Sequence, residues 1–484
     1  MENITEIINI CRSANRTVNE MMSRENITLD EWIESEKTKL DKNKTLPVLA
    51  DKSDLIDLCA EYVAKRISKE AAEKVSQVLE YGVMFTPNHH GGLYSAQSFQ
   101  GDLFYARFLK KINPNVPCAP EFSFGLVPLN SSTFARGLLA HTRTDDVEKI
   151  PIFPKAPTNA AASLKESFNA AMIRRTGDKA FAQVKSYRVR KKIRELMETL
   201  YNSQDILAQK RYAEQIFLIA DGIYRKLSDI TGIETFYHME AEKIFSELLI
   251  KEYSKKDSFI YHFLNAPECI KVLNNTQNNE GRKFSSLLFL GCGDDERCFT
   301  LNLCEDGFLR GRNAAGKEYC FVLDFDTLSG ALQEMKIMPH VYLIWLMGGF
   351  LRGFTWYGGI FQSQYLQLWH KKTCEILAES RMKDLKDSRE NYDCSGYLSG
   401  PIYILFDTGD GAVNAGPLEV MAFTPSVESS ENLFCSTDLK SAHEMGMFEF
   451  YNDIMLPAEK KENWYATIAR YSKENYEKHS LQNL

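Results

Sequence analysis

One stretch, Tyr81–Lys111, constrains the fold of this chain more than any other. It opens with a short apolar run, Val83–Phe85, of the kind that a buried parallel strand shows. Thr86–Gly92 follows with a proline and two glycines, which is turn chemistry. Apolar residues then recur at helical spacing at Phe99, Leu103, Ala106 and Leu109. The stretch therefore predicts a buried strand, a tight turn and a helix in direct succession.

The polar residues of this turn are candidates for a binding or catalytic site. In open α/β sheets, ligands bind at the carboxyl ends of the strands, where backbone N–H groups at a helix start are free to meet an anion. We therefore take His89 and His90 as candidate catalytic residues. The other candidates from this stretch, expected to bind substrate or nucleotide, are Asn88, Gly91, Gly92 and Gln97. The alternative is that the two histidines only cap the turn.

Composition limits the class of protein. A chain of 484 residues exceeds the usual size of one domain, so two or three structural units are expected. A formal charge of −7 argues against a nucleic-acid partner. The longest apolar run, Val341–Leu351, is too short to span a bilayer, so no membrane partner is expected. The 11 cysteines form no C-x-x-C pair and no secretory signal is present, which predicts reduced thiols and a cytoplasmic location.

Three further regions have their own patterns. Residues 1–80 predict three or four helices with solvated charged faces. Residues 161–265 have few Gly or Pro residues and predict a paired-helix arm or coiled coil, through which two copies could form a homodimer. Residues 280–330 contain short apolar runs separated by Gly and Asp, which predict a small antiparallel meander.

Two more segments supply polar residues after an expected strand. Ala119–Leu129 predicts a second buried strand, and Asn130 and Arg136 lie just beyond it. The planar guanidinium of Arg136 suits a carboxylate or phosphate, although a surface arginine would give the same pattern. Further on, Ile337–Trp345 predicts another strand, with Arg352 after it as a second candidate for holding a carboxylate.

A second turn resembles the first. Gly358 and Gly359 precede an expected helix, which again places flexible backbone at a helix start. The candidate binding residues of this turn are Trp356, Tyr357, Gly358, Gly359, Gln362 and Tyr365. Near the carboxyl terminus, Leu418–Phe423 predicts a strand, and Asp407, Asp410 and Asn414 form a polar turn whose spacing is not that of a calcium loop. No metal ligands are assigned.

The order of these features resembles the cysteine-adding ligase family of bacillithiol biosynthesis, over about residues 80–370. That family has a Thr-Gly-Gln-Gln turn where this chain has Thr86–Gly92, and a Pro-Asn-Val strand where it has Pro339–Val341. Its Tyr-Val-Gly-Gly turn is similar to Trp356–Gly359. The resemblance implies an α/β protein with a Rossmann-like, nucleotidyltransferase-type parallel-sheet core, a helical insertion and a small meander. Residues 81–160 would form the first part of the core, and residues 331–484 its second part together with a carboxyl-terminal segment that does not follow the family.

The resemblance also implies a function, within limits. It implies a ligase that condenses an amino acid or other carboxylate with an amine, using ATP or another adenine nucleotide. This chain departs from the family, because Asn88 and His89 replace the paired glutamines and Gln362 replaces an acidic residue. The family's substrates are therefore not carried over. Two alternatives remain open: a metal-dependent hydrolase that uses the His89 and His90 turn, and a non-catalytic scaffold.

Overall fold

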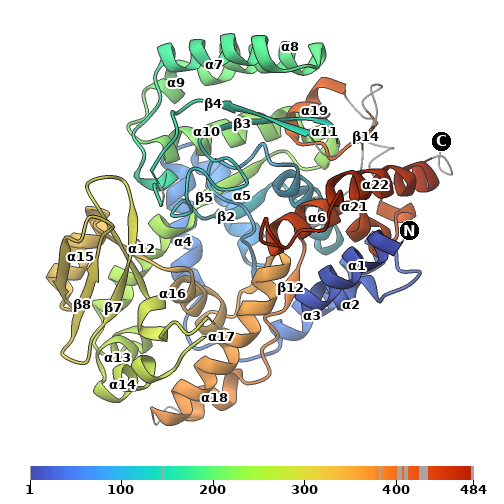
Figure 1. Cartoon of the computed structure of the whole chain (residues 1–484). Helices are drawn as coiled ribbons and strands as arrows, with labels where there is room; N and C mark the ends of the chain where they lie inside the picture. Colours follow the sequence, from blue (N-terminus) through green and yellow to red (C-terminus); the bar gives the residue numbers. More distant parts are fainter. Residues whose placement is uncertain are drawn as a thin grey trace.

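Short parallel strands lie at the centre of the molecule, and helices surround them (Figure 1). The computed structural model describes residues 2–143, 146–157, 159–278, 280–380, 383–399, 406–407, 412–423 and 434–480. In this part the chain is a mixed α/β protein with small parallel sheets and one larger antiparallel sheet. The sequence-based prediction of an α/β class with parallel strands and a separate meander is confirmed at this level.

Two groups of parallel strands form the centre. The first sheet has the order β1 (Val83–Phe85), β11 (Thr355–Gly358) and β12 (Gly396–Tyr397). The second is the pair β2 (Ala119–Ser123) and β5 (Phe236–Glu240). Every residue of these five strands is buried, which explains why β1 is encoded by a continuous apolar run instead of an alternating one.

A bridge beyond the strand ends joins the two groups. His89 and Phe124 form an isolated parallel bridge, just after β1 and β2 respectively. The backbone N–H of His90 donates to Phe124 O at 2.8 Å, and the N–H of Phe124 donates to Asn88 O at 3.0 Å. The turn after β1 therefore runs alongside the end of β2.

The predicted strand, turn and helix at the start of the core are confirmed. The helix is α6 (Ala96–Ile112), and its last turn carries Lys110 and Lys111, where cations oppose the helix dipole. In the turn, Gly91 has φ +94°, and a Cβ there would lie 2.9 Å from the carbonyl oxygen of Ala135. Glycine at this position is thus required both by backbone conformation and by space.

Several strands of the structure are not predicted by the sequence patterns, among them β3, β4 and β5. β3 (Gly137–Arg143) and β4 (Asp146–Pro151) form an antiparallel pair. β5 lies inside residues 161–265, and its pairing with β2 shows that this segment is not an uninterrupted helical arm. The rest of the segment is helical, with its principal helices at α7 (Ala170–Gln183), α8 (Tyr187–Leu196), α10 (Tyr212–Lys226), α12 (Ala241–Tyr253) and α13 (Phe259–Asn265).

The predicted antiparallel meander is confirmed, and it is larger than expected. A five-stranded sheet has the order β10, β6, β7, β8, β9, with antiparallel pairing throughout. Its strands are β6 (Phe289–Cys292), β7 (Cys298–Leu303), β8 (Phe308–Arg312), β9 (Glu318–Val322) and β10 (Ile337–Pro339). The expected strand Ile337–Trp345 is only in part a strand, because α16 (Val341–Trp345) follows β10 directly.

Five helices form the amino-terminal region, one more than the upper expectation. They are α1 (Glu2–Ala14), α2 (Arg16–Met22), α3 (Leu29–Lys44), α4 (Ser53–Ala64) and α5 (Lys69–Leu79). The capping box at the start of α3 is present, because the N–H of Glu31 donates to Thr28 Oγ1 at 3.2 Å and the N–H of Thr28 donates to Glu31 Oε2 at 2.9 Å.

The carboxyl-terminal region returns to the amino terminus. α21 (Leu439–Ile454) packs against α1 and α2, and α22 (Trp464–Ser480) packs against α21 (Figure 1). The prediction of a strand at Leu418–Phe423 is wrong, since these residues belong to α19 (Pro417–Phe423). Proline at the first helical position and Glu419, which accepts from Gly416 N–H at 2.9 Å, favour a helix start here. No helix within the described residues is long and apolar enough to cross a membrane.

Candidate functional site

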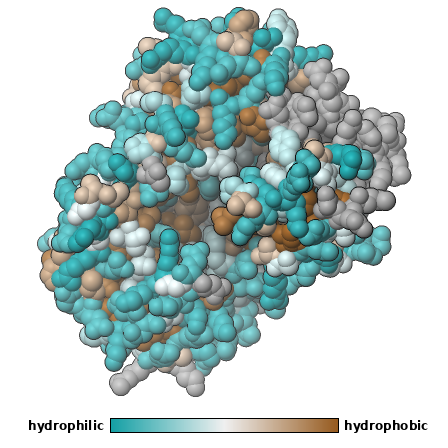
Figure 2. Space-filling model, viewed as in Figure 1, coloured by the Kyte–Doolittle hydropathy of each residue, from teal (hydrophilic) through white to brown (hydrophobic). Residues whose placement is uncertain are grey.

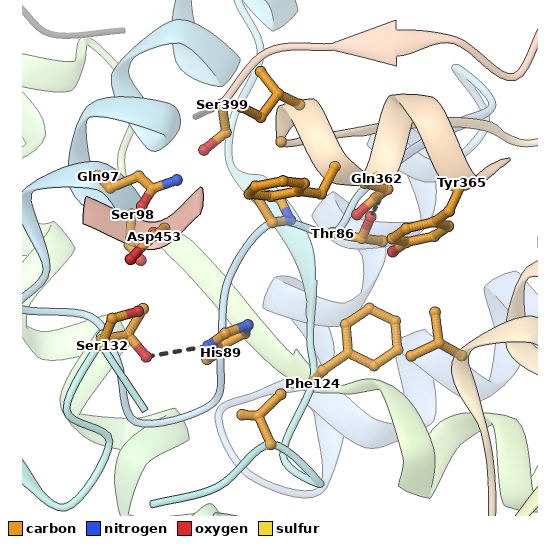
Figure 3. A pocket seen from close by; sticks show the side chains of 17 residues that line it. Thr86, His89, Gln97, Ser98, Phe124, Ser132, Gln362, Tyr365, Ser399 and Asp453 are labelled. Atoms are coloured by element: carbon orange, nitrogen blue, oxygen red, sulfur yellow. Dashed lines mark hydrogen bonds between the residues drawn. The ribbon is translucent and has the colours of Figure 1, made fainter. Parts of the chain in front are cut away.

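A cavity of about 360 Å³ lies at the carboxyl ends of the parallel strands (Figure 3). Thr86 follows β1, Gly359 follows β11 and Ser399 lies just beyond β12, and all three line the cavity. Phe124, which follows β2, contributes part of the wall. On the face shown in Figure 2 the surface is mostly hydrophilic, and apolar residues are exposed in a hollow near its middle. The position is the one at which open α/β sheets bind ligands.

Two long helices begin at this cavity. α17 (Ile360–Glu379) has Gly359 as its N-cap, which has no side chain to cap the helix. α6 has Ser95, whose side chain makes no capping hydrogen bond. Gln97 and Ser98 from the first turn of α6 line the cavity, as do Ile360 and Gln362 from the first turn of α17. The first backbone N–H groups of a helix have no partner within the helix, and the dipole adds partial positive charge there. Both helix starts can therefore meet an anionic group.

His89 is the candidate histidine that faces the cavity. Its Nδ1 lies 3.1 Å from Thr133 Oγ1, and Thr133 also lines the cavity (Figure 3). Burial lowers the pKa of His89 to about 4, so the imidazole is neutral at pH 7. A neutral imidazole held in one orientation can accept a proton from a bound group.

Gln362 forms the back of the cavity with Thr86. Its Nε2 donates to Thr86 Oγ1 at 2.6 Å, and its side chain lies over Gly358, where a Cβ would come within 2.4 Å of Gln362 Cδ. Gly358 is thus needed so that Gln362 can fold back toward the strand. Beside it, Tyr365 lies 4.4 Å from Trp369, measured between ring centroids. Phe124 and Tyr365 lie on this side of the cavity (Figure 3), and together with Phe361, which also lines the cavity, they form its aromatic wall.

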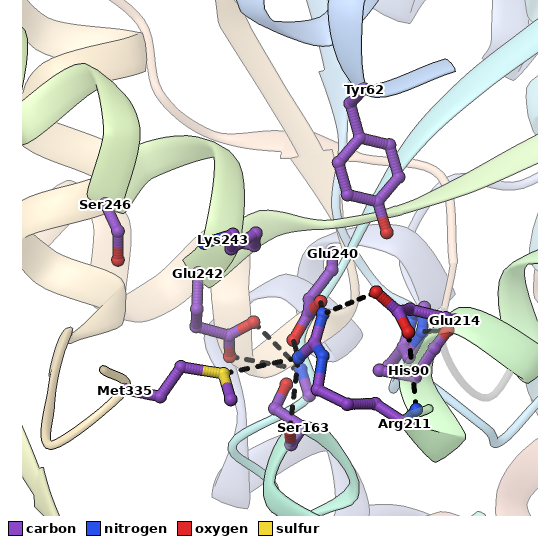
Figure 4. Close-up of polar contacts among 12 residues, drawn as sticks. Tyr62, His90, Ser163, Arg211, Glu214, Glu240, Glu242, Lys243, Ser246 and Met335 are labelled. Atoms are coloured by element: carbon purple, nitrogen blue, oxygen red, sulfur yellow. Dashed lines mark hydrogen bonds and ion pairs between the residues drawn. The ribbon is translucent and has the colours of Figure 1, made fainter. Parts of the chain in front are cut away.

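His90 points into the interior. Its Nε2 lies 2.7 Å from Ala213 O, it is fully buried, and burial lowers its pKa. Figure 4 shows it beside Arg211 and Glu214, and His90 is not among the residues that line the cavity. The two adjacent imidazoles have different surroundings and face no common point, so the geometry does not favour a metal-dependent hydrolase in which both are ligands.

The two candidate arginines hold structure together and do not line the cavity. Arg352 is fully buried, and its Nη2 lies 2.5 Å from Glu252 Oε1 while Nη1 donates to Met347 O. Arg136 Nη1 donates to Phe153 O at 2.9 Å. Each guanidinium is held by partners away from the cavity, so the structure does not bring these two predicted catalytic residues to it.

Other predicted binding residues are also structural. Trp356 and Tyr357 are fully buried in β11, where the sequence suggested an open turn. Asn130 donates from Nδ2 to Ala156 O at 2.6 Å and does not line the cavity. Gly91 and Gly92 shape the first turn, and Asn88 lies beneath it. Of the predicted set, the cavity brings together His89, Gln97, Gly359, Gln362 and Tyr365.

Several lining residues were missed in the sequence. Ser132 and Thr133 come from the predicted polar segment after β2, so the region was expected and the individual residues were not. Ser399 follows a strand of two residues, too short to be recognised from its pattern. Asp453 belongs to α21, and no local signal connects it to residues so distant in sequence. Of the polar turn at Asp407, Asp410 and Asn414, Asp410 lies outside the described residues.

The cavity carries little charge. Among the described residues that line it, Asp453 is the one with a formal charge at pH 7, since His89 is neutral. An anionic ligand would therefore rely on the helix starts, and an ammonium group would suit Asp453. Within the described residues, the group that could share a metal ion, Asp102, Glu121 and His238, is fully buried and does not line the cavity.

Comparison of the sequence with protein-family models and with curated proteins finds no match. The interpretation of the cavity therefore depends on its own geometry.

Proposed function

We propose that the cavity binds an adenine nucleotide and that the protein is an amide-bond-forming ligase built on a Rossmann-like core. The observation that carries the proposal is the meeting of two uncapped helix starts, α6 and α17, with the ends of three parallel strands at one cavity. In nucleotide-binding α/β proteins, phosphate groups bind at such helix starts. A volume of about 360 Å³ is in the range of small-molecule sites.

The cavity offers groups for both the base and the phosphates of a nucleotide. The aromatic wall of Phe124, Phe361 and Tyr365 offers faces against which a planar base can stack. The first turns of α6 and α17 offer backbone N–H groups to the phosphates. Because no described Lys or Arg lines the cavity, phosphate charge would be balanced by these N–H groups and by any cation bound with the nucleotide.

The remaining polar groups support an amine as the second substrate. A carboxylate such as Asp453 can hold an ammonium group by a charge-assisted hydrogen bond. His89, neutral and oriented by Thr133, would accept the proton that the amine loses as it attacks the carbonyl carbon of a carboxylate activated by the nucleotide, from which phosphate or AMP then leaves. Holding the two substrates next to each other would supply much of the rate enhancement.

Gly359 provides a direct test of the anion site. Its backbone is extended (φ −81°, ψ 175°), and a Cβ would meet only Ser399 O at 3.6 Å, so side chains fit here. In Gly359→Asp, the carboxylate would cap α17 and occupy the place of a phosphate. We expect this variant to fold normally and to lose ATP binding, measured by isothermal titration calorimetry.

Gly359→Ala is the matched control, since it adds a Cβ without a charge or a capping group. It should bind ATP as the wild type does. Equal ATP binding by the Asp and Ala variants would show that no anion binds at α17 and would overturn the proposal.

A further inference from the structure

A second polar cluster lies in the interior, at Asp102, Glu121 and His238. Asp102 belongs to α6, Glu121 to β2 and His238 to β5, and their exposed fractions are 0 %, 0 % and 2 %. One carboxylate oxygen or imidazole nitrogen from each lies within 4.8 Å of the others. Two neighbouring elements, α6 and β2, and the distant strand β5 therefore bring ligand-type atoms to one buried point.

The strand register brings two of these residues together. Parallel pairing of β2 with β5 sets Glu121 opposite His238. Glu121 Oε2 and His238 Nε2 are 3.5 Å apart, and neither His238 Nε2 nor Glu121 Oε1 has a hydrogen-bond partner although both are buried. An unpaired buried polar atom is costly, so the unpaired His238 Nε2, which faces the Glu121 carboxyl, indicates that a binding partner belongs there.

Other buried carboxylates of this protein have an evident partner. Glu240, two residues after His238, pairs with Arg211 at 2.9 Å (Figure 4). Glu36 pairs with Lys39 at 2.7 Å, and Glu252 pairs with Arg352.

The Asp102 and Glu121 carboxyls differ from these. Asn88 Nδ2 donates to Asp102 Oδ1 at 2.7 Å and to Glu121 Oε2 at 2.5 Å, and the Tyr224 hydroxyl donates to Asp102. These donors carry no charge, and no described Lys or Arg forms an ion pair with either carboxyl. Two adjacent ionised carboxylates in the interior need positive charge nearby, which Lys or Arg supplies at Glu36, Glu240 and Glu252.

We propose that Asp102, Glu121 and His238 bind one divalent transition-metal ion of the zinc type, in a structural site beneath the turn after β1. A divalent ion would balance the two carboxylate charges. Ligand atoms on a tetrahedral zinc ion lie about 2.0–2.1 Å from it and thus about 3.4 Å from one another, close to the 3.5 Å between Glu121 and His238. Two oxygen ligands and one imidazole suit zinc or a neighbouring first-row ion.

Asn88 offers a fourth ligand. Its Oδ1 is buried without a partner, and a half-turn of its amide would exchange Nδ2 for Oδ1 beside the carboxylates. Because Asn88 precedes His89, and because Asp102 lies one helical turn after Ser98, the ion would fix both the first turn and the start of α6. Its role would thus be to hold the cavity wall in place.

Metal analysis of the purified full-length protein tests this proposal. After equilibration with excess zinc and removal of free metal, mass spectrometry of the elements should find close to one equivalent of zinc per chain. Glu121→Gln, which preserves the shape of the side chain, should remain folded by circular dichroism and lose most of that zinc. The control variant Glu36→Gln alters a buried carboxyl elsewhere in the protein and should retain the bound zinc.

The competing state is a metal-free pair of carboxyls that share a proton. In that case the wild type would hold well under a tenth of an equivalent of zinc per chain. Zinc and chelators would leave its melting temperature unchanged, and Glu121→Gln would have the same melting temperature as the wild type. That set of results would overturn the proposal. Cobalt substitution gives a readout independent of the variants, because visible absorption bands of bound cobalt should appear in the wild type.

Discussion

The cavity at the strand ends and the interior beneath it differ in the polar groups that they contain. The cavity is almost uncharged, and its capacity to bind an anion lies in backbone N–H groups at two helix starts. The interior contains several buried carboxylates, most of them tied to a cation or to backbone N–H groups. The adjacent residues His89 and His90 show this contrast, because His89 faces the cavity and His90 faces the interior. Substitutions in the interior should therefore change stability, and substitutions in the cavity should change binding.

The largest effect on stability is expected at Arg211. Although burial raises the pKa of Glu240, the charge and hydrogen bonds of Arg211 hold it at about 2. Arg211→Ala would leave Glu240 charged and unpaired inside the protein, at a cost of about 3–5 kcal/mol in the free energy of unfolding. Urea denaturation measures this loss. A double variant, Arg211→Ala with Glu240→Gln, should recover part of it, and no recovery would argue against the charge as the cause.

Glu242 should have the next largest effect. Its carboxylate accepts the backbone N–H groups of Gly125 at 3.0 Å and Leu126 at 2.9 Å, directly after Phe124. Glu242→Ala would leave these donors without a partner, which costs about 1–3 kcal/mol for a buried donor. Because Phe124 lines the cavity, this interior substitution should also weaken ligand binding. Glu242→Gln retains an acceptor and should lose less stability, so equal losses in the two variants would contradict this explanation.

Glu419 gives a test by pH. Burial raises the pKa of its carboxyl to about 8, above the value of about 4.3 expected in the unfolded chain. The group therefore stabilises the fold fully below about pH 4.3, and this contribution is lost as pH rises toward 8. Glu419→Gln cannot ionise, so its free energy of unfolding relative to the wild type should increase between about pH 5 and about pH 8. A difference that does not change with pH would show that Glu419 does not titrate in this way.

The smallest effect on stability is expected at His89. His89→Ala removes one hydrogen bond to Thr133 at the cavity wall, which is worth about 1 kcal/mol. The same substitution at His90 removes a fully buried side chain and should destabilise the fold more. Thermal denaturation ranks the two variants. The contrast between cavity and interior would fail if His89→Ala were the more destabilising of the two.

Local patterns predicted the parts of the fold that depend on local sequence. The unit of β1, turn and α6 and the meander follow from apolar runs, glycines and helical spacing within a few tens of residues. β5 was missed because its five residues occur within a strongly helical segment, and only pairing with β2 makes them a strand. β12, with two residues, depends in the same way on β11.

The candidate site was predicted in part for a similar reason. Residues at the two glycine turns were found, since a turn before a helix can be recognised in one segment. Arg136 and Arg352 do not line the cavity, and the sequence does not show the carbonyls and the carboxylate that hold them. Asp453, and the cluster of Asp102, Glu121 and His238, depend on contacts between distant segments and have no local signature.

The proposal that the cavity binds an adenine nucleotide is tested most directly by a calorimetric titration of the wild-type protein with ATP and with adenosine. The two ligands share the base that the aromatic wall would hold, and they differ in the phosphates that the starts of α6 and α17 would hold. Nucleotide binding at this cavity predicts that ATP binds with one site per chain and at least about tenfold more tightly than adenosine, a difference of about 1.4 kcal/mol in binding free energy. Absence of ATP binding to folded protein, or equal affinity for the two ligands, would contradict it.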